Sequence, residues 1–133
     1  MAEPEQGKEE SERPSRPLRW LHGEIKTPPF SKEARREAGF LLRELQDGRP
    51  VKFPQAEPLT TVGPHCGALR VRDDRHSWRI MYRLDDGAVL IIDVYAKKTR
   101  KIPDEVIARC RKRLKNDDAA KAAQAKKGKN DGH

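Results

Sequence analysis

Five arginines recur within the segment LRVRDDRHSWRIMYRL, at positions 70, 72, 75, 79 and 83. Most of their neighbours favour strands, and like charges placed opposite each other on adjacent strands repel. The arginines therefore add little to the stability of a sheet. A guanidinium binds a phosphate through two parallel hydrogen bonds, and an aromatic ring among cations can stack on a base. RNA fits this chemistry, because the unpaired bases of single-stranded RNA stack on aromatic rings while its phosphates bind the cations.

A second group of reactive side chains follows the arginines. It consists of an acid, a phenol and an amine, at Asp93, Tyr95 and Lys97. We expect one exposed, concave sheet face to carry Arg70, Arg72, Arg79, Arg83, Asp93, Tyr95 and Lys97. The alternative is an ordinary solvated face with an Arg79–Asp93 pair, worth well under about 1 kcal/mol. A face selected for solubility alone would mix the two signs of charge more evenly.

The charge balance also indicates a polyanionic partner. The chain has 133 residues, which is room for one domain, and a formal net charge of +8. Residues 20–114 contain twenty basic and thirteen acidic residues, so this region alone has a net charge of +7. Such a domain suits nucleic acid, an anionic membrane surface or an acidic protein.

The two ends of the chain differ in composition from the middle. Residues 1–18 are rich in Pro, Glu and Ser, which predicts a disordered tail, and residues 116–133 are Ala/Lys-rich and of low complexity. We therefore place a single domain at 19–115. No signal peptide or membrane-spanning run is visible, so we expect a cytoplasmic protein without a membrane partner. Cys66 and Cys110 have no ligand-like spacing, so we expect free thiols, no metal and no cofactor.

Helical spacing of apolar residues occurs twice. Ser31 is suited to cap the first helix and Gly48 to end it. Its apolar positions are Phe30, Ala34, Ala38, Leu41, Leu42 and Leu45. Pro103 begins the second helix, whose apolar positions are Val106 or Ile107, Cys110 and Leu114. The proline-rich segment 49–67 is predicted to be mostly loop.

Alternation with period 2 predicts strands at 68–72, 78–84 and 88–97, and residues 17–25 could add a short edge strand. In 88–97 the pattern puts Leu90, Ile92, Val94 and Ala96 on one face, opposite Val89, Ile91, Asp93, Tyr95 and Lys97. A four-residue loop over 73–76 would place Arg70 opposite Arg79.

Two turns are possible between the last two strands. A two-residue Asp86–Gly87 turn would put Arg83 on the same face as Leu90 and mix polar with core residues. A three-residue loop over 85–87 instead pairs Tyr82 with Leu90 and Arg79 with Asp93, so we prefer it. The predicted fold is α+β, with both helices packed on one face of a small antiparallel sheet in two layers.

Four segments resemble the phage-derived, HigB-like branch of the RelE/ParE toxin superfamily. They are WLHGEIKTPPFSKEARREAGFLLRELQDG, LRVRD, WRIMYRLDDGAVLIIDVYAKKT and IPDEVIARCRKRL, between Trp20 and Leu114. The resemblance implies the helix-plus-sheet fold and the toxin of a type II toxin–antitoxin system, with a small helix-turn-helix antitoxin as partner. Many such toxins are endoribonucleases that cut mRNA in the ribosomal A site, so it also implies mRNA and the ribosome as partners.

The resemblance also implies a chemistry. The 2′-OH of RNA attacks the adjacent phosphorus and leaves a 2′,3′-cyclic phosphate, which needs a base, an acid and charge stabilisation. By position, Arg70 and Arg79 match the arginines that hold the phosphate, and Lys97 and Lys98 match the KKT pair. Tyr95 is a possible acid or stacking platform. Arg72, Arg83 and Asp93 would then contact RNA.

Departures from the family pattern leave other functions open. Many relatives carry His-Glu where this chain has Gly67-Ala68, and His65 and His76 are predicted to lie in loops. A ParE-like toxin that targets gyrase and a non-catalytic RNA- or DNA-binding module are therefore the alternatives.

Overall fold

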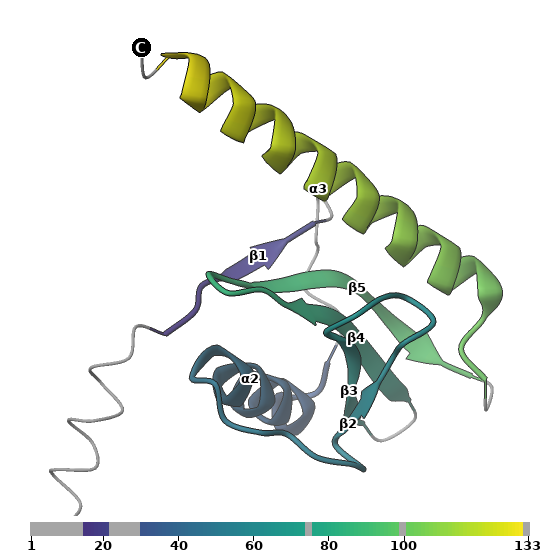
Figure 1. Cartoon of the computed structure of the whole chain (residues 1–133). Coiled ribbons are helices and arrows are strands. Elements are labelled where there is room, and N and C mark those ends of the chain that lie inside the picture. The colour runs from purple at the N-terminus through teal and green to yellow at the C-terminus, as the bar shows by residue number, and fades with distance from the viewer. Residues whose placement is uncertain (1–14, 22–29, 74–75, 99–100, 132–133) are drawn as a thin grey trace, which may run out of the picture.

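The computed structural model describes residues 15–21, 30–73, 76–98 and 101–131, and its elements form one mixed sheet with two helices (Figure 1). The strands are β1 (Leu18–Trp20), β2 (Ala56–Pro58), β3 (Cys66–Arg72), β4 (Ser77–Leu84) and β5 (Val89–Lys97). The helices are α2 (Lys32–Gln46) and α3 (Asp104–Asp131). The strand order is β1-β5-β4-β3-β2. The predicted α+β class is confirmed, although the sheet is not purely antiparallel, because β1 pairs in parallel with β5.

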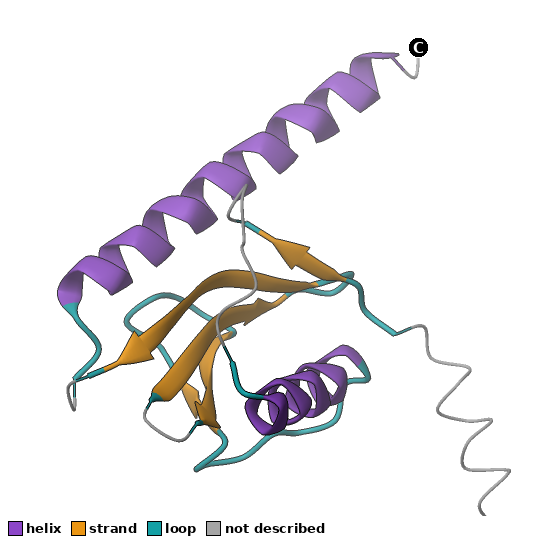
Figure 2. Ribbon diagram, turned by 180° about the vertical axis from the view of Figure 1, so that it is seen from behind, coloured by secondary structure: helices purple, strands orange, loops and turns teal. Residues whose placement is uncertain are grey.

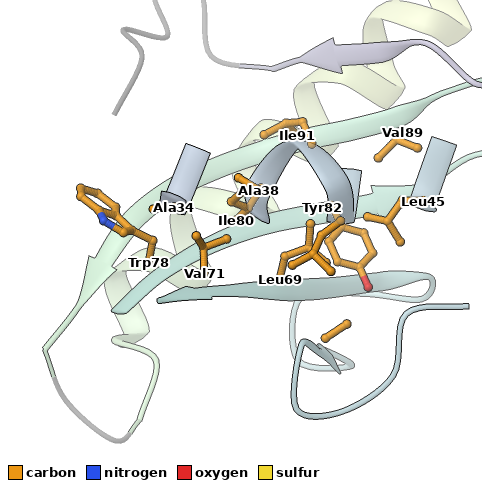
Figure 3. Packing of buried hydrophobic residues seen from close by; sticks show 12 residues of the cluster. Ala34, Ala38, Leu45, Leu69, Val71, Trp78, Ile80, Tyr82, Val89 and Ile91 are labelled. Atoms are coloured by element: carbon orange, nitrogen blue, oxygen red, sulfur yellow. The ribbon is translucent and has the colours of Figure 1, made fainter. Parts of the chain in front are cut away.

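Helix α2 begins and ends where the sequence predicts. The backbone N–H of Ala34 donates to the Ser31 hydroxyl oxygen at 3.1 Å, which satisfies one of the free amides of the first turn. Gly48 follows the helix with φ of 77°, a left-handed conformation that glycine adopts without strain. The apolar face of α2, which carries Ala34, Ala38, Leu41 and Leu45, packs on β3, β4 and β5. Figure 3 shows Ala34, Ala38 and Leu45 above the sheet.

The two predicted hairpin registers have opposite outcomes. Arg70 lies opposite Arg79, so the register predicted for the first hairpin is confirmed. The preferred pairing of Tyr82 with Leu90 is wrong, because Tyr82 pairs with Ile91 and Arg83 with Leu90. This is the register of the two-residue turn, closed by a bond from the Asp85 N–H to the Ala88 carbonyl at 2.9 Å. The fold tolerates Arg83 beside Leu90 because Asp85 and Asp118 bind its guanidinium.

A β-bulge in the β4–β5 pair changes which side chains share a face. The register shifts between Met81 and Tyr82, so Tyr82 pairs with Ile91 and Met81 with Asp93. The extra residue in β5 is Ile92, and the alternation therefore reverses after it. The predicted common face of Leu90, Ile92, Val94 and Ala96 is wrong: the first two pack on the α3 side and the last two on the α2 side.

The two helices cover opposite faces of the sheet (Figure 2). The prediction that both pack on one face is therefore wrong. The reason is a second apolar patch, which β3, β4 and β5 present on the other side. On this side Val106, Cys110 and Leu114 of α3 bury Cys66, Ala68, Met81, Leu90 and Ile92.

Two segments outside the predicted helices and strands form regular structure. Residues 56–58 pair with β3 as strand β2, with Glu57 opposite Ala68. Helix α3 continues to Asp131, so the predicted domain boundary at 115 falls inside a helix. Asp118 of this continuation binds Arg83 at 2.8 Å, and Asp117 binds Arg19 of β1 at 2.9 Å. Of the predicted N-terminal tail, residues 1–14 lie outside the described residues.

Candidate nucleic-acid interface

The face of the sheet that α3 covers is divided into an apolar half and a charged half. The apolar half lies under α3. The charged half carries one side chain from β2, one from β3, one from β4 and two from β5: Glu57, Arg70, Arg79, Tyr95 and Lys97. We call these five residues the charged cluster. Pairing aligns three of them in a row across the sheet, because Arg70 lies opposite Arg79 and Arg79 opposite Tyr95.

Arg79 is the buried centre of the charged cluster, with only 3% of its surface exposed. Its Nη1 donates to the Ser77 hydroxyl at 2.7 Å and to the Trp78 carbonyl at 3.2 Å. Its Nε lies 3.9 Å from the Glu57 carboxylate. Burial, and next the charge of Arg70, lower the pKa of Arg79. The expectation that Arg79 is exposed is therefore wrong, because neighbouring strands enclose its side chain.

Arg70 is the half-buried neighbour of Arg79. Its guanidinium carbon lies 5.9 Å from the centre of the Phe53 ring, within the range of a cation–π contact. Among the described residues, none forms an ion pair with Arg70. Its guanidinium therefore remains available to an anion from outside the protein.

Lys97 and Tyr95 complete the cluster on β5. Burial, and next the charge of Arg79, lower the pKa of Lys97, so its ammonium gives up a proton more easily than a free lysine does. Burial raises the pKa of Tyr95, and its hydroxyl is buried without a hydrogen-bond partner among the described residues. Lys98 and Arg72 are exposed at the ends of β5 and β3.

Glu57 is the member of the cluster that the sequence pattern does not indicate. It is the one carboxylate of the cluster, beside two arginines, a lysine and a tyrosine. Its side chain is 30% exposed. Glu57 influences the electrostatics of Arg79, Tyr95 and Lys97. Strand β2 has only three residues and ends at Pro58, so it shows no usable alternation. The only signal was a lone acid in a proline-rich segment.

Arg83 and Asp93 are not part of the cluster. Arg83 binds the carboxylates of Asp85 and Asp118, and the hydrogen bonds that its guanidinium donates to them, to Asp118 first, raise its pKa. Asp93 is 8% exposed and binds Arg109 at 2.6 Å and Arg113 at 2.9 Å, both on α3. The predicted Arg79–Asp93 pair is therefore wrong, because the bulge places Met81 opposite Asp93.

Within the described residues no histidine belongs to the cluster. His65 and His76 lie in loops, as predicted, and His76 packs edge-on against Trp78. At position 67 a Cβ atom would lie 2.5 Å from the Tyr82 hydroxyl oxygen. Glycine is needed there because the Tyr82 side chain occupies the space.

Both cysteines are buried and free, as predicted. Burial raises the pKa of the Cys66 thiol and raises that of Cys110 to about 12. Buried protonated thiols behave as small apolar side chains.

A family model described as "Phage derived protein Gp49-like (DUF891)" matches residues 28–115. The matched range contains α2, β2 to β5 and the beginning of α3, and it includes the whole charged cluster. No curated protein and no solved structure matches the chain. No helix within the described ranges has the length and apolar content needed to cross a membrane.

Proposed function

The chain belongs to the Gp49-like family of phage-derived proteins, a RelE/ParE-like toxin family of toxin–antitoxin systems, and we propose that it is a ribosome-dependent mRNA endoribonuclease. Its partners in this proposal are mRNA, the ribosome and a small helix-turn-helix antitoxin. The proposal places it in the HigB-like branch. The domain that carries the activity is residues 19–115, with the remainder of α3 as an extension.

One observation carries the proposal: four strands bring Arg70, Arg79, Lys97, Tyr95 and Glu57 together beside the part of the face that α3 covers. The cluster combines groups that bind a phosphate with groups that accept and donate protons. A surface that only attracts polyanions needs no carboxylate, because a carboxylate weakens the attraction. The presence of Glu57 therefore favours a nuclease over a non-catalytic binding module.

Each residue takes a role in the cleavage. Glu57 accepts the proton of the 2′-OH as O2′ forms its bond to phosphorus. Arg70 binds the phosphate oxygens, and Arg79 beneath it adds positive charge in a desolvated setting, where charges act more strongly. The bond from phosphorus to O5′ breaks, and O5′ takes a proton from Lys97. We assign this acid to Lys97 because the Tyr95 hydroxyl is buried. The products are a 2′,3′-cyclic phosphate and a 5′-hydroxyl.

The ribosome supplies what the cluster lacks. The described part of the cluster contains no histidine, and Arg79 is too buried to reach a phosphate directly. When the ribosome holds an mRNA with its 2′-OH in line for attack, this positioning can lower the activation barrier by several kcal/mol. We therefore expect scission of a reporter mRNA in a translating extract and little scission of the same RNA alone.

Glu57→Gln tests the proposed base with almost no change of shape. We expect it to slow scission in the extract by about 100-fold or more, while RNA binding is kept or strengthened. Glu33→Gln is the matched control, because Glu33 is an exposed glutamate in the first turn of α2. Equal scission by Glu57→Gln and the parent would remove Glu57 from the mechanism.

Growth arrest distinguishes this activity from that of a gyrase-targeting toxin. Pulse labelling after expression without antitoxin should show protein synthesis falling before DNA synthesis. If DNA synthesis fell first while translation persisted, the ribonuclease proposal would be wrong.

A further inference from the structure

Phe53 is the most exposed large hydrophobic residue described, with 71% of its surface accessible. It lies in the segment that leads into β2, next to the charged cluster. A single exposed aromatic ring is common on protein surfaces and needs no explanation by itself. The position of this ring is informative because of what surrounds it.

The first neighbour is Arg70, whose guanidinium carbon is 5.9 Å from the centre of the ring. The same arginine approaches Arg79 and Lys97 closely enough to lower the pKa of each. Arg70 therefore contacts the Phe53 ring and also belongs to the proposed phosphate site. Such a contact leaves part of the ring open, as its exposure confirms.

The second neighbour is a pocket of about 390 Å³. Its lining includes Phe53, Lys52, Glu57, His65, Tyr82 and Leu84. The pocket combines apolar and aromatic walls with a few polar groups, a composition typical of sites for small organic ligands. Glu57 lines this pocket and also belongs to the charged cluster, although the pocket walls formed by Tyr82 and Leu84 belong to the core on the α2 side of the sheet.

We propose that Phe53 and Arg70 form a binding site for one unpaired nucleobase, next to the phosphate that the charged cluster binds. The base stacks on the open face of the Phe53 ring, and Arg70 connects this ring to the phosphate. Stacking of bases on aromatic side chains is a general source of affinity for single-stranded RNA. The inference rests on the proposed function in that it takes RNA as the ligand.

Tyr95, the stacking platform expected from the sequence, is less suited to this role. Its side chain packs against the core under α3, and its hydroxyl is buried. The Tyr95 ring is partly buried against that core. Phe53, with 71% of its surface accessible, offers the same type of surface with more of it open.

Binding of two oligonucleotides of equal length tests the site without requiring cleavage. One is a short single-stranded RNA with 2′-O-methyl groups, which cannot be cut, and the other has the same backbone without bases. We expect the full chain to bind the first more tightly. Phe53→Ala should weaken that binding by roughly 5- to 150-fold and leave binding of the abasic backbone unchanged.

Phe40→Ala is the matched control, because Phe40 is also an exposed phenylalanine, at 62%, but lies on α2 on the other side of the sheet. It should not change either affinity, and Phe53→Trp should retain the preference for bases. The proposal would be overturned if Phe53→Ala bound the base-bearing RNA as well as the parent, or if the parent did not distinguish the two oligonucleotides.

Scission of unmodified mRNA in a translating extract separates this inference from the proposed function. Loss of base-dependent binding in Phe53→Ala, together with a parent that cuts no RNA, would support the base site and reject the nuclease. Conversely, equal scission at the same nucleotides by the parent and Phe53→Ala would support the nuclease and reject the base site.

Discussion

Arg79 illustrates how a charged residue becomes part of the interior of a small protein. Its side chain is 4% exposed, so its charge must be satisfied by the Ser77 hydroxyl, the Trp78 carbonyl and the more distant Glu57. Its Nε is buried without a hydrogen-bond partner in the described part of the chain. A buried cation that is only partly satisfied lowers stability, and functional sites commonly retain such groups.

Even so, Arg79→Ala should destabilise the fold as well as abolish toxicity. The substitution leaves Ser77 and Glu57 without their partner and opens a cavity, although it also removes the repulsion from Arg70. We expect a net loss of roughly 1–3 kcal/mol in the free energy of unfolding, measured with urea. Arg72→Ala is the control, because Arg72 is exposed and should shift stability by less than about 0.5 kcal/mol. Unchanged stability in Arg79→Ala would indicate that its side chain lies in solvent.

Strand β5 and helix α3 are joined by charge as well as by apolar contact. Past the bulge, Asp93 faces α3, where it binds Arg109 and Arg113. Its side chain is 11% exposed, whereas those of Arg109 and Arg113 are 41% and 19% exposed. Asp93 is thus the most buried of the three partners. Its two ion pairs fix the position of α3 along β5.

Asp93→Ala should loosen α3 without unfolding the sheet. Two arginines lose their shared acceptor, and we expect a loss of roughly 1.5–3 kcal/mol in unfolding free energy, less any part that solvent compensates at Arg109. Relative to the parent, the increase in the hydrogen-exchange rate should be largest at residues 104–114 and smaller in β3 and β4. Asp104→Ala is the control, since the Asp104 side chain is 89% exposed and its pair with Lys101 spans 3.9 Å. Uniformly faster exchange in every element would contradict a local role.

At the scale of the whole molecule, two apolar cores lie on opposite faces of one sheet, and charge collects where the second core ends. Helix α3 covers only part of its face and leaves Arg70, Arg72, Lys97 and Lys98 partly or fully exposed. These four cations are available to phosphates. A net charge of +8 attracts polyanions in general, but this set of side chains determines where they bind.

RNA affinity should accordingly fall with salt in proportion to these four charges. For single-stranded RNA, four phosphate contacts predict a slope of roughly −3 in log K against log salt concentration. Arg72→Ala should reduce the slope by about 0.7, because Arg72 is exposed beside the cluster. Arg36→Ala removes the same charge from the exposed side of α2 and should leave the slope unchanged. Equal effects of both variants would mean that binding follows net charge rather than this surface.

Local chemistry along the chain determined several elements on its own. Ser31 and Gly48 delimit α2 because capping and left-handed backbone depend on a single residue type. Alternation within 68–72 and 78–84 gives each strand one apolar face, which lies under α2 and carries Leu69, Val71, Trp78 and Ile80, and the short loop at 73–76 places Arg70 opposite Arg79. These features need only interactions between residues close in sequence.

The side of α3, the bulge at Ile92 and the place of Glu57 were decided only by the tertiary structure. Both faces of β5 carry apolar residues, so its alternation cannot say which face a distant helix covers. A bulge is one extra residue in one strand, and the partner strand determines where it is accommodated. Glu57 reaches Arg79 only through the pairing of β2 with β3 and of β3 with β4. Contacts between strands and helices far apart in sequence set all three, and one strand's own pattern contains no information about them.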